Sequence, residues 1–229
     1  MKTVVRGRSG RSRWAVVAAV SVIAASGAGA QTPDADAILD RAVAAYGQVS
    51  TLRADFTQTV HDPMIGSDDT SRGEYLQQRP KFAIRWRQPS GDMIVSDGQT
   101  VWVYTPSSQP GQVIRQDVTG RQGESGDFLA QFLDRPKERF TVTYERAEGV
   151  GSRPAAVLAL AAKDRNAAYR TVRIWVDRQD NLVRRIEITG PAGDTRRIVL
   201  DRLRVNQPIA AASFVFRPPA GARVVDATH

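Results

Sequence analysis

Apolar and polar side chains alternate along three short segments between residues 79 and 104. Because successive side chains of a strand point to opposite faces of a sheet, this period of two predicts strands with one apolar face. Depending on the register of the strands, that face carries Phe82, Ile84, Trp86, Val101 and Val103, or else Trp102 and Tyr104. Nothing in the stretch resembles a nucleophile, a metal ligand or a phosphate-binding loop. The pattern therefore favours a protein that holds something apolar over one that cleaves it.

The same period of two continues along most of the chain after residue 51. We expect strands at 52–60, 72–78, 81–87, 92–96, 100–105, 111–116, 139–144, 155–161, 169–176, 182–189, 195–204 and 213–216. Asp97-Gly98, Asp180-Asn181 and residues 191–194 mark tight turns between them. Strands joined by short turns are antiparallel neighbours, and the chain shows no alternation of strands with helices. A parallel sheet is thereby excluded.

Two segments follow a helical period instead. The first begins at Thr32-Pro33-Asp34, with a cap candidate and a proline at the first position, and continues as an apolar stripe to Val49. The second, at 124–133, has Ser125 as its cap candidate and Pro136 beyond its end. Its apolar face carries Phe128, Leu129, Phe132 and Leu133. This helix either packs on the outside of the sheet or lies as a plug or lid over the mouth of a curved sheet, and spacing alone leaves both open.

About a dozen antiparallel strands with two amphipathic helices predict a mainly β protein of the α+β class. The arrangement is a barrel or half-barrel with helices across its open face, and a barrel of this size can enclose a cavity. Large aromatic side chains within the strand and helix segments either line such a cavity or belong to an ordinary core. They are Phe82, Trp86, Trp102, Phe128, Phe132 and Trp175.

The first thirty residues are typical of a cleaved signal peptide. Lys2 and four arginines precede an apolar run from Trp14 to Ala25, which is too short for a stable membrane anchor, and Ala28-Gly29-Ala30 offers a cleavage site. We expect a Sec-type signal at 1–30 and one exported domain at 31–229. An uncleaved anchor is the alternative. Because no Cys follows the apolar run, a lipid-modified N-terminus is excluded.

The charge balance looks different once the signal is set aside. Five of the 32 Lys and Arg residues and none of the 24 acids lie in residues 1–30, which leaves 27 bases against 24 acids. No basic stripe follows, so a nucleic-acid partner is not expected. The chain has no Cys and therefore no disulfides.

Candidate catalytic chemistry is scarce. His61 and His229 are the two histidines, and without Cys they cannot form a persuasive zinc site or Cys-His nucleophile. Nucleophile-elbow, P-loop and dinucleotide-binding motifs are absent from the sequence. We expect no catalytic residue, metal or cofactor. A glycosidase with two carboxylates is the enzyme hypothesis that remains, because such pairs meet only in space.

Several motifs occur in a specific order. Gly73, Arg79-Pro80, Arg85-Trp86, Pro89, Val95-Ser96-Asp97-Gly98 and Trp102-x-Tyr104-x-Pro106 follow one another. The apolar helix leads into Leu52-x-Ala54-x-Phe56-x-Gln58, and the C-terminal run is Ser213-Phe214-Val215-Phe216-x-Pro218-Pro219-x-Gly221-x-x-Val224. Over nearly all of the chain after residue 30, this order resembles the periplasmic outer-membrane lipoprotein carrier family, LolA.

The resemblance implies an incomplete antiparallel β-barrel covered by a helical lid that encloses an apolar cavity. It also implies a chaperone, not an enzyme, that accepts lipoproteins released by an inner-membrane ABC transporter and carries them to an outer-membrane receptor. We expect a monomer. The alternative is a module of the same fold that binds lipid or senses lipoproteins outside lipoprotein sorting.

The resemblance also implies roles for residues. Arg79 resembles the arginine that holds the lid shut through backbone carbonyls; a solvated charge at a strand end is the alternative. The acyl-chain cavity is expected to be lined by Phe82, Ile84, Trp86, Trp102, Tyr104, Phe128, Leu129, Phe132 and Trp175. One extra residue separates Arg79-Pro80 from Arg85-Trp86 compared with the family pattern, so either Phe82 or Ile84 takes the cavity-facing place.

Overall fold

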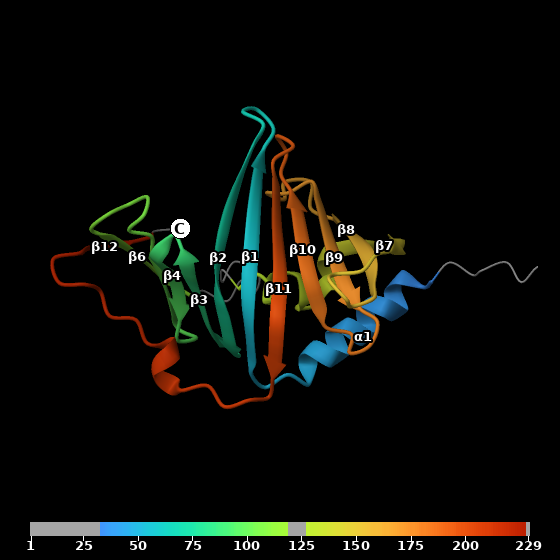
Figure 1. Ribbon diagram of the computed structural model, residues 1–229, viewed down its shortest axis with the longest axis horizontal. Coiled ribbons are helices and arrows are strands. Elements are labelled where there is room, and N and C mark those ends of the chain that lie inside the picture. The colour runs from blue at the N-terminus through green and yellow to red at the C-terminus, as the bar shows by residue number, and fades with distance from the viewer. Residues whose placement is uncertain (1–32, 119–126, 228–229) are drawn as a thin grey trace, which may run out of the picture. The chain divides into compact units, whose positions relative to one another are not determined.

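Twelve strands form one continuous sheet in the computed structural model, which describes residues 33–118 and 127–227 (Figure 1). From one edge to the other the order is β12-β6-β5-β4-β3-β2-β1-β11-β10-β9-β8-β7. The edge strands β12 and β7 do not pair, so the sheet stays open. The prediction of a mainly β, incompletely closed antiparallel sheet with helices is confirmed. The predicted signal peptide and the Ser125 cap lie outside the described residues.

The strand bounds follow the predicted segments closely up to residue 205. They are β1 (Leu52–Asp62), β2 (Ser67–Gln78), β3 (Lys81–Gln88), β4 (Ser90–Ser96), β5 (Thr100–Tyr104), β6 (Gln112–Asp117), β7 (Phe140–Ala147), β8 (Ala155–Ala162), β9 (Thr171–Asp177), β10 (Val183–Thr189), β11 (Thr195–Val205) and β12 (Arg223–Asp226). Each pair from β6 across to β7 is antiparallel.

The C-terminal region differs from the prediction. The strand expected at 213–216 is wrong: Ala211–Phe214 form the 3-10 helix η1, and Val215 lies outside the sheet. The twelfth strand is instead β12, which pairs with β6 in parallel, so the sheet is not antiparallel throughout. A long connection carries the chain from β11 to the far edge of the sheet, and such a connection permits parallel pairing where a tight turn does not.

The first helix, α1 (Ala35–Gly47), begins two residues after its predicted first position, Pro33. Asp34 caps it by accepting hydrogen bonds from the amides of Asp36 and Ala37 at 3.0 and 3.3 Å, so Pro33 precedes the cap instead of opening the helix. Leu39 and Tyr46 belong to its buried stripe. No helix among the described residues is long and apolar enough to cross a membrane.

The second predicted helix is much shorter than expected. Helix α2 spans only Ala130–Leu133, and a further short helix, α3 (Pro136–Arg139), follows it. Phe128 and Leu129 are buried in the turn ahead of α2. Together with α1, this segment packs against one side of the sheet, which we call the inner face. The segment therefore covers the sheet from the same side as α1.

The inner and outer faces have separate cores. The inner core is the largest apolar cluster of the described residues and joins side chains of α1, α2 and nine strands. Two smaller clusters lie on the outer face: Leu76, Ala83, Val95 and Phe214 in one, and Val150, Ala155, Val157 and Trp175 in the other. The sheet thus has apolar side chains on both faces: α1 and α2 cover the inner one, while η1 packs on the outer one through Phe214.

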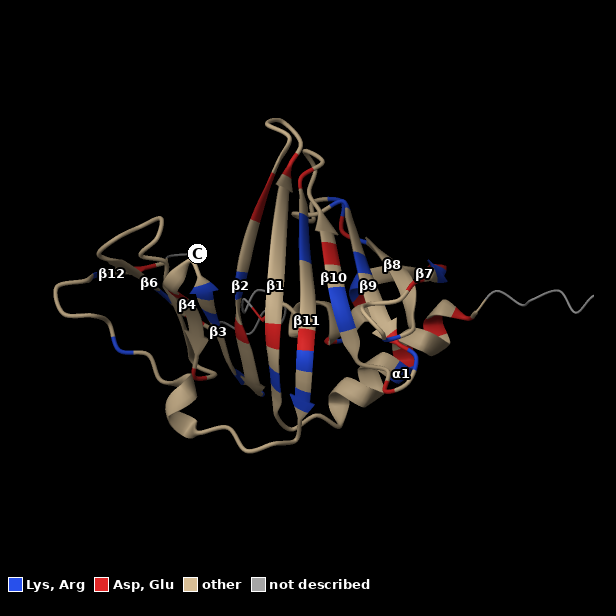
Figure 2. Ribbon diagram, viewed as in Figure 1, with Lys and Arg blue, Asp and Glu red and all other residues tan. Residues whose placement is uncertain are grey.

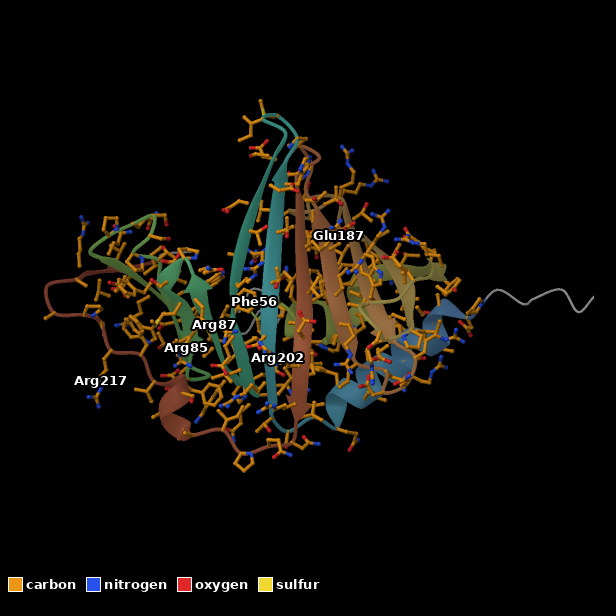
Figure 3. The ribbon with its side chains drawn as sticks, viewed as in Figure 1. Phe56, Arg85, Arg87, Glu187, Arg202 and Arg217 are labelled. Atoms are coloured by element: carbon orange, nitrogen blue, oxygen red, sulfur yellow. The ribbon has the colours of Figure 1, made fainter. Side chains whose placement is uncertain are left out.

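The outer face also carries ion pairs across strands. Both acidic and basic residues occur along β1, β10 and β11 (Figure 2). Arg87 of β3 and Arg202 of β11 approach Asp55 of β1 from two sides (Figure 3). Arg87 also donates to the carbonyl of Gly73 on the intervening strand at 2.9 Å. These pairs connect four neighbouring strands without using the inner face.

A buried acid at the end of β9 should make stability depend on pH. Burial raises the pKa of Asp177, but hydrogen bonds from the Gln179 amide and from the Arg153 and Arg184 guanidiniums outweigh it, so the pKa lies below its usual value of 3.8. Asp177 therefore stabilises the fold above that pH, and the contribution is lost as the pH falls through the lower folded-state pKa.

Asp177→Asn should lower the free energy of unfolding by about 2 kcal/mol at pH 7, because it weakens hydrogen bonds to a charged acceptor. Urea unfolding from pH 7 to pH 3 should show the difference from wild type shrinking below about pH 4. The exposed turn residue Asp164 accepts one backbone hydrogen bond, so Asp164→Asn is a control with little expected effect. A pH-independent difference for Asp177→Asn would contradict the argument.

Candidate functional site

The inner face of β3 carries both residues between which the sequence left a choice. Phe82 and Ile84 are two positions apart, so their side chains share one face, and both are buried in the inner core. Trp86 continues the row and is half-buried against the same core. Phe82 and Ile84 therefore both face inward, and Trp86 lies with them.

Two predicted cavity residues on β5 point the other way. The pairing of Ser96 with both Phe82 and Val101 puts Val101 and Val103 on the inner face, so the first of the two predicted sets is the inward one. Trp102 and Tyr104 lie on the outer face, with ring centroids 5.6 and 6.0 Å from that of Phe216. Their predicted place beside Phe82 is wrong, because the segment after β11 covers the outer face and gives large aromatic rings an apolar neighbour there.

Trp175 of β9 is also on the outer face. Its neighbours in the chain, Ile174 and Val176, belong to the inner core, while Trp175 packs beneath the guanidinium of Arg185, 4.7 Å from its ring centroid. The side chain is buried, so its apolar character is satisfied without any cavity. Its predicted place in the inner pocket is therefore wrong.

The predicted residues around α2 do meet the inner face of the sheet, on β1, β2 and β7. Phe128 lies 4.4 Å from Tyr75 and 6.5 Å from Phe56, measured between ring centroids. Phe132 is fully buried and lies 6.1 Å from Phe140. Leu129 helps to line a remaining cavity of about 10 Å³ beneath α1. That volume is about what one water needs, so side chains fill the space beneath the C-terminal half of α1. A larger pocket of about 420 Å³ lies at the other end of the helix, between Ile38 and Tyr144.

Arg79 lies just after β2 and binds the C-terminal end of α1. Its Nη2 donates to the carbonyls of Tyr46, Gly47 and Val49 at 3.1, 3.2 and 2.9 Å. The guanidinium also lies 4.6 Å from the centroid of the Tyr46 ring. The last carbonyls of a helix have no partner within the helix, so a cation there is favourable. Arg79 is exposed, as the alternative of a solvated charge at a strand end expects, but its guanidinium binds the end of α1. Its role in closing a lid stays a prediction.

A cluster of buried polar side chains near Arg79 was not predicted from the sequence. Asp127 is 4% exposed and accepts hydrogen bonds from Tyr75 Oη at 2.7 Å and Gln77 Nε2 at 2.6 Å. Gln77 Nε2 also donates to Tyr46 Oη. We call these four residues the Asp127 cluster; it connects α1 and the start of α2 to β2.

The Asp127 cluster also organises the backbone ahead of α2. Asp127 Oδ1 accepts from the amides of Leu129 and Ala130 at 3.0 and 3.1 Å, as a capping residue does. Burial, and then the Asp127 charge, raise the pKa of both Tyr46 and Tyr75 well above 10, so both hydroxyls stay protonated. One signal in the sequence could have indicated the Asp127 cluster: Tyr75 and Gln77 occupy alternate positions ahead of Arg79.

Phe56 is a second residue that was missed as part of this site. It meets Trp86 edge to face at 5.6 Å between centroids and lies opposite Gly73 on β2. A Cβ at position 73 would be 2.6 Å from the Phe56 ring and 2.2 Å from the carbonyl oxygen of Arg85. A glycine inside a strand is a sign of close approach, and here it admits the ring to the inner core.

Gly73→Ala should therefore destabilise the protein by about 2 kcal/mol, since the added methyl overpacks the inner face and pushes on a neighbouring backbone. Thermal or urea unfolding would measure it. Gly47→Ala is the control, because a Cβ at Gly47 would meet nothing within 4 Å. Equal stability of the two variants would show that the inner face has room at Gly73.

Among residues 33–118 and 127–227, no group of three or more His, Cys, Asp or Glu side chains is arranged to hold a metal. The site consists of an apolar sheet face, two helical segments packed on it, and polar groups that fasten those segments. Such an arrangement can bind or release apolar matter by moving its cover.

Several known proteins are similar to this chain in sequence or in fold. A protein from Chromobacterium violaceum named "Outer-membrane lipoprotein carrier protein" is 28% identical over 176 residues, covering 76% of this chain and 81% of that protein. One from Bordetella avium with the same name is 28% identical over 193 residues, covering 83% and 88%. The structure of an uncharacterized conserved protein from Thermus thermophilus has the same fold, with a TM-score of 0.55, 15% identity, and coverage of 84% and 98%.

The two relatives that match most of this chain are named as lipoprotein carriers. The family described as "Outer membrane lipoprotein carrier protein LolA" matches residues 47–217, which is most of this chain. The chain belongs to that family.

Proposed function

We propose that this protein is a periplasmic chaperone that binds the acyl chains of lipoproteins released from the inner membrane and carries them to an outer-membrane receptor. Its other partner is the inner-membrane ABC transporter that releases the lipoproteins, and the protein works as a monomer after loss of a Sec-type signal peptide. Membership of the lipoprotein carrier family supports this function. The observation that carries it is an apolar inner face closed by segments that Arg79 and Asp127 fasten.

The acyl chains set the physical task. Each methylene that leaves water contributes about 0.8 kcal/mol, so exposed acyl chains oppose release from a membrane by tens of kcal/mol. The carrier must cover them and yet give them up without consuming ATP. A site that binds moderately, because opening it breaks favourable contacts, meets both demands.

In this proposal the acyl chains take the place that α1 and the α2 segment now fill. Displacing these segments would uncover the side chains of Phe82, Ile84 and Trp86 on β3, while Phe128, Leu129 and Phe132 move with the cover. Trp102, Tyr104 and Trp175 take no part, because they lie on the outer face. Breaking the contacts of Arg79 and of the Asp127 cluster offsets part of the gain from burying acyl chains and keeps the affinity low enough for transfer.

A release assay tests the function. Spheroplasts that retain palmitate-labelled lipoproteins in the inner membrane, with the cognate transporter present, are incubated with the purified protein. Soluble one-to-one complexes of labelled lipoprotein with this chain are the expected result. Binding of free lipid without acylated protein would favour the alternative, a lipid-binding module outside lipoprotein sorting. No binding of either would contradict both.

A further inference from the structure

The turn between β1 and β2 presents two large apolar side chains to water. Met64 is 89% exposed and Ile65 is 75% exposed, which makes them the most exposed large apolar residues of the described chain. The turn lies at the far end of a long hairpin and is the topmost point of the sheet in Figure 1. We call residues 62–66 the hairpin tip.

The hairpin tip is rigidly built. Asp62 Oδ1 accepts a hydrogen bond from the Met64 amide at 2.8 Å, and the Asp62 carbonyl accepts one from the Gly66 amide at 2.9 Å. Gly66 has a φ of +62°, the left-handed conformation that glycine adopts without strain. The backbone therefore holds the Met64 and Ile65 side chains outward in the free protein.

Apolar residues at such a place need an explanation. Turns usually carry Gly, which adopts positive φ freely, or Asn, Asp and Ser, whose short polar side chains suit water and the backbone of the turn. Neither Met64 nor Ile65 belongs to any apolar cluster of the described residues. They contribute nothing to this fold, and a pre-ordered apolar projection loses little conformational entropy when another surface covers it.

The charges around the hairpin tip indicate what covers it. Asp62, Asp68 and Asp69 surround the two apolar side chains on the hairpin and are exposed. The neighbouring β10–β11 turn adds the exposed Asp194; a Cβ at its Gly193 would lie 3.8 Å from Pro63.

Two of the four basic groups nearby are paired with acids. Arg197 pairs with Glu187 at 2.9 Å and His61 with Asp68 at 2.7 Å. Arg196 and Arg170 keep their charge, because they donate to neutral groups, Gln58 and the carbonyl of Pro191. The turn itself, residues 62–69, contains three acids and no base, so the hairpin tip is an apolar projection with acids beside it.

We propose that the hairpin tip docks into an apolar pocket, rimmed by Lys or Arg, on a membrane-bound partner protein that loads or unloads the carrier. The partner is a protein and not the bilayer, because an acidic surround is repelled by anionic lipid headgroups and attracted by a basic rim. The inference rests on the proposed function, since it assigns this surface to the exchange of cargo.

The test compares binding to native envelope membranes with binding to protein-free vesicles of the extracted lipids. Met64→Ser/Ile65→Ser and Asp69→Lys should each lower binding to native membranes at least tenfold. The matched controls are Val215→Ser, a residue 56% exposed on the C-terminal segment, and Asp201→Lys, an exposed acid near the opposite end of β11. Both controls should bind as wild type does.

A photo-crosslinking residue at position 65 identifies what the hairpin tip touches. An adduct with a protein segment that is apolar and flanked by Lys or Arg is expected. An adduct with lipid, binding to protein-free vesicles, or stronger membrane binding by Asp69→Lys would overturn the proposal in favour of insertion into the bilayer. Unchanged membrane binding by Met64→Ser/Ile65→Ser would overturn it outright.

Loading is measured separately so that the two hypotheses do not fail together. Purified lipoprotein is diluted from detergent into the carrier without any membrane, and soluble complexes are counted. The variants of the hairpin tip should load as wild type does, since the inner face is unchanged. Failure of wild type to load would reject the carrier function itself, whereas normal loading with normal docking by the variants would reject only the docking surface.

Discussion

Arg79→Leu should give a protein that takes up acylated cargo but hands it on at least tenfold more slowly than wild type. The substitution removes three donated hydrogen bonds from the end of α1 and the contact with the Tyr46 ring. A hydrogen bond from a charged group contributes about 1.5–3 kcal/mol, and about 1.4 kcal/mol corresponds to a factor of ten in affinity. Losing this closing energy favours the cargo-bound state, because α1 no longer competes as strongly with the acyl chains for the inner face.

The measurement is transfer of labelled lipoprotein from a preformed complex to outer-membrane vesicles that contain the receptor. Arg85→Leu is the matched control, because Arg85 also donates to a backbone carbonyl, that of Ser213 at 2.6 Å, but fastens the C-terminal segment. That variant should transfer cargo normally. Normal transfer by Arg79→Leu would remove Arg79 from the mechanism while leaving the family assignment untouched.

The sheet itself follows from local patterns. Alternation of side chains and short turns predicted the first eleven strands, and the antiparallel pairing of neighbours followed from turn length. The C-terminal strand is the part of the fold that these patterns did not predict, because its pairing joins segments far apart in the sequence. β12 pairs with β6 across about a hundred residues of chain, and nothing near Arg223 indicates a parallel partner.

Alternation identifies two faces of a strand but not which face is inward. The structure puts Phe82, Ile84 and Trp86 together on the inner face of β3, where the sequence left Phe82 and Ile84 as alternatives. On β5 and β9 large aromatic rings favoured the wrong face. There the inward positions are held by aliphatic side chains, and the rings of Trp102 and Trp175 are covered by Phe216 and Arg185. The period of two does not predict where the residues that cover these rings lie.

The sequence predicts only part of the contacts that hold the helical segments to the sheet. The contacts of Arg79 were expected from resemblance to a family, since an arginine before a proline has no local reason to reach a helix end. The helical period predicts a ten-residue helix that includes Asp127, because its partners Tyr75 and Gln77 lie about fifty positions away and leave no local signal. Its side chain instead caps a single turn, which explains why α2 is short.

Arg79 and Asp127 fasten different parts of the same cover. Arg79 binds the end of α1, whereas Asp127 binds the backbone ahead of α2. Gln77 connects the two, because its amide donates to both Tyr46 and Asp127. Opening at one segment therefore weakens contacts at the other, and we expect the two segments to move cooperatively.

Asp127→Ala should lower the free energy of unfolding by about 3 kcal/mol or more, since it leaves two buried donors, Tyr75 Oη and the Gln77 amide, without their acceptor. It should also release the amides of Leu129 and Ala130, so hydrogen exchange over residues 127–133 should accelerate more than exchange in β2. Urea unfolding measures the first effect and hydrogen exchange with mass spectrometry the second. The variant should load cargo more readily than wild type, for the reason that applies to Arg79→Leu.

Asp92→Ala is the matched control for this prediction. Asp92 is a buried acid of β4 that accepts hydrogen bonds from the Ser107 amide and hydroxyl at 3.1 and 2.5 Å, away from both helical segments. Its loss should destabilise the protein without changing exchange at 127–133. Combining Asp127→Ala with Arg79→Leu should change stability by less than the sum of the two single effects, because the sites share the Gln77 contacts. Strict additivity, with unchanged exchange at α1 in Asp127→Ala, would mean that the two segments open independently and that Arg79 alone governs release.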